Sequence, residues 1–411
     1  SKALPKLCRE YKKERATVHL KELVGGALSF YAAAAVAKTG GVHIFVAEDR
    51  DAAAYLLNDF YNLLDEKQVY FFPSSYKRSA AYGAEDAQGV VQRTTAMNAV
   101  RGFTKGYLVV CTYPEALAER VVDAATLQRD TIAVKLGDKI SIAVLEDALA
   151  DANFTRVDFV YEPGQYSVRG GIVDVFSYSE SKPYRIDFFG DEVDSIRRFN
   201  ISSQLSADKL DRVEIVPNLN AGEAPRVSFV QFAGSSATCW FYDADYVLRR
   251  VNDLRRKVLA DMEEPGQIDR LLTSRNVLLR DMAGNSVVAL RDNLPERPAT
   301  AAVVFDTAPQ PKFNKNFEML ADDMIRNSLR GYATYILSEN KVQVERLENI
   351  FHQIGRGQAA VRSLSVTLHE GFVDNDLKLC LYTDHQIFDR YQRYRINGEI
   401  RRDEQMTVAE L

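Results

Sequence analysis

The chain has 411 residues, of which 46% are hydrophobic and 27% charged, a composition typical of soluble globular proteins. This length exceeds what one hydrophobic core ordinarily holds together, so we expect two to four domains. With 52 basic and 57 acidic residues the formal net charge is −5, which argues against a dedicated duplex-binding module but leaves room for a local basic patch. No run of about 18 apolar residues and no signal peptide occur, so we expect no membrane span.

The cysteines and histidines predict neither a metal site nor a disulfide framework. The four cysteines are far apart and form no CxxC pair, which fits a reducing cytoplasm: Cys8, Cys111, Cys239 and Cys380. The five histidines are equally scattered, and His369-Glu370 lacks the second histidine of an HExxH zinc motif. No GxSxG motif indicates a serine hydrolase.

Between residue 17 and about residue 125, apolar strands alternate with helices. The predicted helices and strands are residues 27–38, 42–46, 52–64, 69–73, 88–101 and 107–112. Such alternation implies right-handed crossovers and a mostly parallel sheet. We therefore assign residues 1–125 to the first part of an α/β domain.

A glycine pair stands where nucleotide-binding α/β domains carry their phosphate loop. Gly25 and Gly26 precede the first predicted helix of this domain, and Ser29 follows them. A working loop has the form GxxxxGK[ST], because its lysine neutralises the terminal phosphates. Here that lysine is missing, and the chain contains no Gly-Lys dipeptide. We interpret the pair as a tight turn in a degenerate loop, and we expect no tight ATP binding, no catalytic residue and no cofactor.

Residues 126–217 are β-rich and dense in turns, which predicts an inserted α+β module. Within residues 185–189, side chains alternate between faces, so Ile186 and Phe188 point one way while Arg185, Asp187 and Phe189 point the other. Gly190-Asp191 then predicts a two-residue hairpin. The next strand is expected to pack through Val193, Ile196 and Phe199.

Two further features of this module concern its predicted outer face. Gly170-Gly171 interrupts an apolar stretch and suggests a bulge or a close backbone approach. A phenylalanine flanked by arginines on a wet sheet face is typical of a contact surface, although a stacked surface pair would look the same. The aspartates at positions 174, 187 and 191 are expected to form salt bridges with the nearby arginines rather than a carboxylate site.

The remainder of the chain is assigned to three more segments. Residues 218–308 return to mixed α/β and read as the second part of the first domain, with a strand at 238–242. A proline cluster precedes a small α/β domain at 309–389, with helices at 317–329 and 342–353 and strands at 333–337, 361–368 and 377–382. Residues 390–411 are polar and read as a linker.

Two basic runs could contact nucleic acid. One includes Arg249, Arg250, Arg255 and Arg256 on a predicted helix, where a solvated helix face is the ordinary explanation. The other is the arginine- and tyrosine-rich stretch 390–402, whose composition suits charge and stacking contacts as well as it suits a linker.

The segment 163–199 closely resembles one shared by UvrB and the bacterial transcription-repair coupling factors, which use it to bind the repair protein UvrA. Further similarities are Phe72-Pro73 with Gln92-Arg93, the stretch 112–117, and residues 369–372 and 383–388. UvrB carries an intact nucleotide loop, whereas the coupling factors have a degenerate one. The missing lysine therefore favours the N-terminal region of a coupling factor.

The resemblance implies a UvrA-binding module with contacts at Arg169, Arg185 and Phe189. In that family the whole protein is an ATP-dependent DNA translocase that displaces stalled RNA polymerase, so RNA polymerase and duplex DNA would be partners of the full-length protein only. Two alternatives stay open: a UvrB-like nucleotide-dependent repair subunit with an unusual loop, and a DNA-binding module that uses the basic helix. The role of residues 309–389 is not indicated by the sequence.

Overall fold

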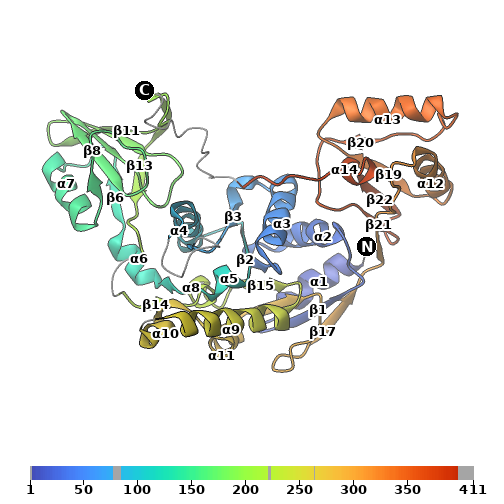
Figure 1. Ribbon diagram of the computed structural model, residues 1–411, viewed down its shortest axis with the longest axis horizontal. Coiled ribbons are helices and arrows are strands. Elements are labelled where there is room, and N and C mark those ends of the chain that lie inside the picture. The colour runs from blue at the N-terminus through green and yellow to red at the C-terminus, as the bar shows by residue number, and fades with distance from the viewer. Residues whose placement is uncertain (1, 77–84, 221–223, 263, 397–411) are drawn as a thin grey trace.

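The computed structural model describes residues 2–76, 85–220, 224–262 and 264–396. Three groups of strands and helices, each with its own hydrophobic core, follow one another across the molecule (Figure 1). We call them the central unit (3–130 and 226–304), the six-stranded unit (132–216) and the C-terminal unit (307–388). The predicted multidomain α/β fold class is confirmed.

A seven-stranded sheet, parallel throughout, forms the centre of the central unit. In spatial order its strands are β17 (Ala301–Val304), β1 (Thr17–Lys21), β16 (Ser286–Ala289), β15 (Thr238–Phe241), β2 (Gly41–Val46), β4 (Tyr107–Thr112) and β3 (Val69–Phe71). Strands that precede the six-stranded unit in the sequence and strands that follow it thus belong to one sheet. The strands are buried almost continuously, as expected of a parallel sheet covered on both faces.

Helices and short turns surround this sheet. They are α1 (Ala3–Tyr11), α2 (Ala27–Thr39), α3 (Arg50–Leu63), η1 (Glu66–Gln68), α4 (Ala87–Gly102), α5 (Pro114–Ala118), α6 (Ala124–Asp130), α8 (Phe229–Ala233), α9 (Ala244–Asp261), η2 (Pro265–Gln267), α10 (Ile268–Leu271), α11 (Arg275–Asp281) and η3 (Met282–Gly284). A short antiparallel pair, β5 (Val121–Val122) with β14 (Arg226–Val227), lies next to the connections to the six-stranded unit.

The six-stranded unit packs one face of its sheet against helix α7 (Ile142–Asp151). In spatial order the strands are β12 (Ser206–Leu210), β11 (Glu192–Phe199), β10 (Tyr184–Phe189), β9 (Ile172–Val175), β8 (Gln165–Arg169) and β7 (Thr155–Arg156). A second small sheet pairs β6 (Ile132–Lys135) with β13 (Arg212–Ile215). Leu145 and Leu149 of α7 share a core with Ile186 and Val193 of the sheet, so the opposite face is the outer one.

The C-terminal unit is a five-stranded mixed sheet with three helices. Its strands, in spatial order, are β18 (Thr307–Pro309), β21 (Phe372–Asp374), β22 (Leu379–Thr383), β19 (Ala333–Leu337) and β20 (Ser363–Leu364), and its helices are α12 (Phe317–Leu329), α13 (Lys341–Gln353) and α14 (Asp384–Ile387). This unit lies at the opposite end of the molecule from the six-stranded unit, beyond α2 and α3 (Figure 1).

Most predicted elements are found within two residues of their expected bounds, but the strand expected over 361–368 is wrong. Only Ser363–Leu364 pair with the sheet. Val366 and Leu368, two of the apolar residues that suggested the longer strand, pack against the core of the central unit. The chain therefore leaves the sheet early to reach a neighbouring unit.

The glycine pair 170–171 was expected to mark a bulge or a close backbone approach. It forms the two-residue turn between β8 and β9, where Arg169 pairs with Ile172, and no bulge. A close approach is also present, since a Cβ on Gly171 would lie 3.0 Å from the carbonyl oxygen of Phe188. The register shift of this region lies between β10 and β11, at Asp187/Phe188. It accounts for the three-residue spacing of Val193 and Ile196, which both face the core.

Candidate partner-binding site

The outer face of the six-stranded sheet carries a row of polar side chains set by strand register. Ser167 pairs with Asp174, Asp174 with Arg185, and Arg185 with Arg197 across four neighbouring strands. The hairpin at Gly190-Asp191 fixes this register, and Gly190 adopts the positive φ of 60° that its turn requires. The predicted alternation is confirmed: Ile186 is buried in the core, while Phe189 is exposed.

Asp174 is the centre of this face. Its carboxylate accepts hydrogen bonds from Arg185 Nε at 2.7 Å and Nη2 at 2.8 Å, and from Arg169 Nη2 at 2.6 Å. The aspartate side chain is only 1% exposed, while those of Arg185 and Arg169 are 15% and 37% exposed. A buried carboxylate is tolerated because two guanidinium groups compensate for its lost hydration. The bidentate hydrogen bonds to Asp174 raise the pKa of Arg185.

Arg185 is held in place by two further residues. Its guanidinium lies 4.4 Å from the centre of the Phe199 ring. Gln204, in the loop between β11 and β12, accepts a hydrogen bond from Arg185 Nη2 through its side-chain oxygen at 3.2 Å. Phe199 is fully buried, as predicted, but it packs under this arginine and is not part of the core that holds Val193 and Ile196.

Phe189 is presented differently. It is the last residue of β10, directly before the hairpin turn, and it is 84% exposed. Strand register places Phe189 on the same face as Arg185, two residues beyond Asp187. Arg169 is two strands away, so standard strand spacing puts the backbones of Phe189 and Arg169 about 12 Å apart. The structure thus joins Arg169 and Arg185 through Asp174 and sets Phe189 on the rim of the same face.

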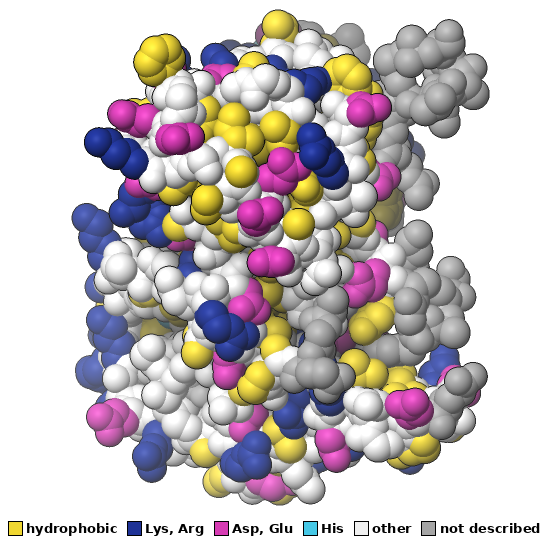
Figure 2. All heavy atoms as spheres, turned by 90° about the vertical axis from the view of Figure 1, so that its left-hand side faces the viewer, with side chains coloured by type: hydrophobic (Ala, Val, Ile, Leu, Met, Phe, Trp, Pro, Cys, Tyr) yellow, Lys and Arg dark blue, Asp and Glu magenta, His cyan; other side chains and the backbone are white. Residues whose placement is uncertain are grey.

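A shallow open pocket borders Arg169. It is lined by Arg156, Val157, Asp158, Phe159, Val168 and Arg169. The guanidinium of Arg169 lies 4.7 Å from the centre of the half-exposed Phe159 ring. Figure 2, which faces the end of the molecule that holds the six-stranded unit, shows hydrophobic side chains among basic and acidic ones in its upper half. An exposed aromatic ring next to an arginine, as at Phe159 and Arg169, is typical of a protein-binding surface.

Three residues of this face were not selected from the sequence. Asp174 was expected to form a salt bridge, but not to join both arginines. Gln204 is 19 residues from Arg185, and no local pattern connects them. Phe159 lies in an irregular segment, where no periodicity indicates which side chains are exposed. Only the aspartate had a usable signal, namely its position opposite an arginine in the predicted sheet.

The glycine loop is enclosed by other parts of the chain. Gly25 has a φ of 57°, which supports the tight turn expected there, while Gly26 has an ordinary helical conformation at the start of α2. Ser29 is buried, and its hydroxyl donates to Asp59 at 2.5 Å. Burial raises the pKa of the Asp59 carboxyl to about 7, although hydrogen bonds from Ser29 and from the backbone of His369 lower it.

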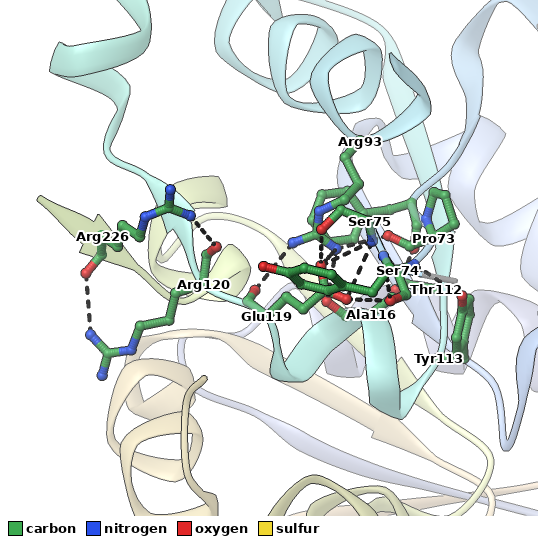
Figure 3. Close-up of polar contacts among 12 residues, drawn as sticks. Pro73, Ser74, Ser75, Arg93, Thr112, Tyr113, Ala116, Glu119, Arg120 and Arg226 are labelled. Carbon is green, nitrogen blue, oxygen red and sulfur yellow. Dashed lines mark hydrogen bonds and ion pairs between the residues drawn. The ribbon is translucent and has the colours of Figure 1, made fainter. Parts of the chain in front are cut away.

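Pro73, Arg93 and the stretch 112–116, one part of each of these three similar segments, meet in one buried polar network (Figure 3). Arg93 donates to the carbonyl oxygens of Pro73 at 2.8 Å and Ala116 at 3.0 Å. The Glu119 carboxylate accepts from the backbone and hydroxyl of Ser75 and forms an ion pair of 3.5 Å with Arg93. Since Arg93 and Glu119 are almost fully buried, this network stabilises the junction of β3, α4 and α5 and exposes no reactive group.

The arginines of the first basic run are engaged with acidic and carbonyl groups. Arg250 pairs with Glu115 at 2.8 Å, and Arg255 donates to the carbonyl oxygen of Leu272 and pairs with Asp269. Arg249 and Arg256 pair with aspartates of their own helix. These contacts support the solvated helix face over a nucleic-acid site.

The second basic run is described only as far as residue 396; its arginines at 401 and 402 lie outside the described residues. Residues 391–396 do not extend away from the fold as a linker would. Tyr394 donates to Asp51 at 3.0 Å, Arg395 pairs with Glu66 at 3.1 Å, and Ile396 is buried in the central core. This stretch is therefore packed along α3.

Within the described residues, no group of three or more His, Cys, Asp or Glu side chains is arranged to hold a metal ion. The four cysteines are buried and unpaired. Burial raises the pKa of the Cys239 thiol to about 12, which keeps it protonated and unreactive. Among the helices of the described ranges, none combines the length and apolar character of a membrane span.

Comparisons with known proteins match the unit that carries this face. Residues 132–220 match the UvrB interaction domain family. Transcription-repair-coupling factors of Bacillus subtilis and Escherichia coli are each 27% identical over 199 residues, 48% of this chain and 17% of the relative. That of Haemophilus influenzae is 35% identical over 101 residues, 25% of this chain and 9% of the relative. The matched stretch thus spans less than a fifth of these relatives.

Proposed function

Since the chain is a relative of the bacterial transcription-repair-coupling factors and carries a UvrB interaction domain, we propose that it recruits UvrA through the outer face of its six-stranded sheet. The observation that carries the proposal is the exposed Phe189 on the same sheet face as a pair of arginines fixed on a buried aspartate. Interfaces concentrate their binding energy in such aromatic and arginine residues.

The three residues have different roles in this proposal. Phe189 is the anchor, because an 84% exposed phenylalanine gains most from burial against a partner. Arg169 is partly exposed and can donate to an acidic group of UvrA. Arg185 uses Nε and Nη2 on Asp174, so its main role is to position this face rather than to bind the partner.

We further propose that this part of the protein hydrolyses no ATP, because the lysine of a phosphate loop is missing after Gly25-Gly26. The chain would then be the UvrA-recruiting N-terminal part of a longer ATP-dependent DNA translocase that acts on stalled RNA polymerase. Contacts with RNA polymerase and duplex DNA would belong to the rest of that protein.

The test is calorimetric titration of purified UvrA with this chain, with Phe189→Ala and with Leu329→Ala. Leu329 is a matched control, since it is 85% exposed and lies on α12 at the other end of the molecule. We expect Phe189→Ala to weaken binding by about 2 kcal/mol, roughly thirtyfold, and Leu329→Ala to leave it unchanged. Equal affinities for all three proteins would refute the proposed site.

The alternative of a UvrB-like nucleotide-dependent subunit is tested in the same instrument with Mg–ATP in place of UvrA. We expect no heat of binding from the unmodified chain. Micromolar affinity for ATP would favour the alternative and contradict the ATPase-inactive assignment.

A further inference from the structure

The glycine loop lies directly beneath a turn of the C-terminal unit. A Cβ on Gly26 would lie 2.0 Å from the carbonyl oxygen of Glu370 and 3.1 Å from its carbonyl carbon. A Cβ on Gly25 would lie 3.0 Å from the carbonyl oxygen of Gly371. Both glycines therefore allow backbone to approach backbone, and no larger residue fits at Gly26 unless the two units separate.

We propose that the C-terminal unit is a built-in plug of the degenerate nucleotide loop. Its 368–371 turn occupies the space over the start of α2 in which the phosphates of a nucleotide would lie, and it fixes the C-terminal unit to the central unit. Phosphates bind such loops by approaching the backbone amides before the first helical turn. In this chain the backbone of another unit makes that approach.

Buried polar contacts beneath the turn hold the plug. Asp59 of α3 accepts hydrogen bonds from the Ser29 hydroxyl at 2.5 Å and from the backbone N–H of His369 at 2.6 Å. Through this one carboxylate, α2, α3 and the turn are joined. The hydroxyl of Tyr31, also in α2, donates to Asp374 of the C-terminal unit.

Apolar contacts surround the polar ones. Leu368 is fully enclosed and belongs to the core of the central unit. Phe30 of α2 packs against Phe372 of β21, with 5.5 Å between the ring centres. The contact is thus a packed interface between the units, which side chains of both fill.

Aromatic contacts on the outer side of α3 complete the attachment. The Tyr55 ring stacks on His369 with 3.7 Å between the ring centres. Its hydroxyl donates to the Gln392 carbonyl oxygen at 3.0 Å and is hydrogen-bonded to the Tyr391 hydroxyl at 2.7 Å. The segment that leaves the C-terminal unit therefore returns along α3, so that α3 is contacted both before and after β21 and β22.

Gly26→Ala tests the plug, with Gly102→Ala as the matched control. The added methyl group of Gly26→Ala would collide with Glu370, whereas a Cβ on Gly102, at the end of α4, has no atom within 4 Å. Small-angle X-ray scattering should show a larger radius of gyration for Gly26→Ala alone. Limited proteolysis between the units should be faster by on the order of tenfold, because the opened state is more populated. Unchanged scattering and cleavage in Gly26→Ala would overturn the proposal.

Tyr55→Ala provides a second variant in case Gly26→Ala fails to fold. It removes the stack on His369 and both contacts to the 391–392 segment while leaving the glycine loop intact. We expect faster proteolysis of the same connections, by a smaller factor than in Gly26→Ala. Cleavage at the rate of the unmodified chain would count against the plug.

UvrA titration separates this inference from the proposed function. The six-stranded unit lies at the far end of the molecule from the plug (Figure 1), so Gly26→Ala should bind UvrA as the unmodified chain does. Loss of UvrA binding in Phe189→Ala leaves the plug untouched. Conversely, opening of the units in Gly26→Ala with no UvrA binding by any form would support the plug and refute the proposed site.

Discussion

The outer face around Asp174 and the glycine loop before α2 both resemble binding sites in sequence. In the folded chain the first is exposed and the second is covered. At Asp174 the fold buries the charge and leaves Phe189 exposed on the rim. At the loop the fold covers Gly25 and Gly26 with the backbone of another unit. A motif therefore indicates which chemistry is available, whereas the packing of distant segments decides whether a partner can reach it.

The largest effect is expected from Asp174→Ala, which tests whether the first region depends on its buried carboxylate. Removing it leaves the guanidinium groups of Arg169 and Arg185 partly buried without their shared partner. We expect the free energy of unfolding, measured by urea denaturation, to fall by about 3 kcal/mol. Asp194→Ala, at an exposed position of β11, is the control and should change little. An equally small loss of stability in Asp174→Ala and Asp194→Ala would show that the ion pairs of Asp174 with Arg169 and Arg185 do not stabilise the fold.

Asp59→Asn tests whether the buried carboxyl beneath the glycine loop makes the stability of the chain depend on pH. Because burial raises the pKa of Asp59 from 3.8 to about 7 in the folded chain, its contribution to stability is fully present below pH 3.8 and is lost as the pH rises through 7. Glu370 is the charged neighbour that raises this pKa further. The neutral asparagine should therefore be more stable than the unmodified chain at pH 8, by about 2 kcal/mol, with little difference near pH 4. Thermal denaturation at both pH values measures this, and a destabilised variant at pH 8 would contradict it.

Ser29→Ala asks whether the loop serine is a structural or a nucleotide-binding residue. Its hydroxyl is buried and donates to Asp59. We expect a loss of about 1 kcal/mol in the free energy of unfolding, the ordinary contribution of one hydrogen bond. Affinity for Mg–ATP, measured by calorimetry, should be negligible before and after the change. An ATP affinity that falls with this substitution would assign the serine to a nucleotide site.

The smallest effect on stability is expected from Phe189→Ala, the variant with the largest expected effect on UvrA binding. Because the side chain is 84% exposed, its removal should alter the free energy of unfolding by less than about 0.5 kcal/mol. Chemical denaturation of the variant beside the unmodified chain gives this value. A marked loss of stability would mean that the phenylalanine packs within the chain and is not held out for a partner.

The local elements and the character of both regions follow from the amino-acid pattern alone. Period-two alternation placed Arg185 and Phe189 on the outer face and Ile186 in the core, and a two-residue turn set the register of the hairpin. These features depend on neighbouring residues, which a single sequence displays directly. The missing lysine after Gly26 was equally visible.

The residues that pack against these features depend on how distant segments of the chain fold together. The contacts of Arg185 with Gln204, and of Gly26 with Glu370, join residues 19 and 344 positions apart, and no periodicity reports such pairs. For the same reason the prediction of a strand over 361–368 was wrong, since the apolar Val366 and Leu368 pack into the core of the central unit and not into their own sheet. Hydrophobic burial is non-directional, so an apolar pattern indicates which residues tend to be buried but not what they are buried against.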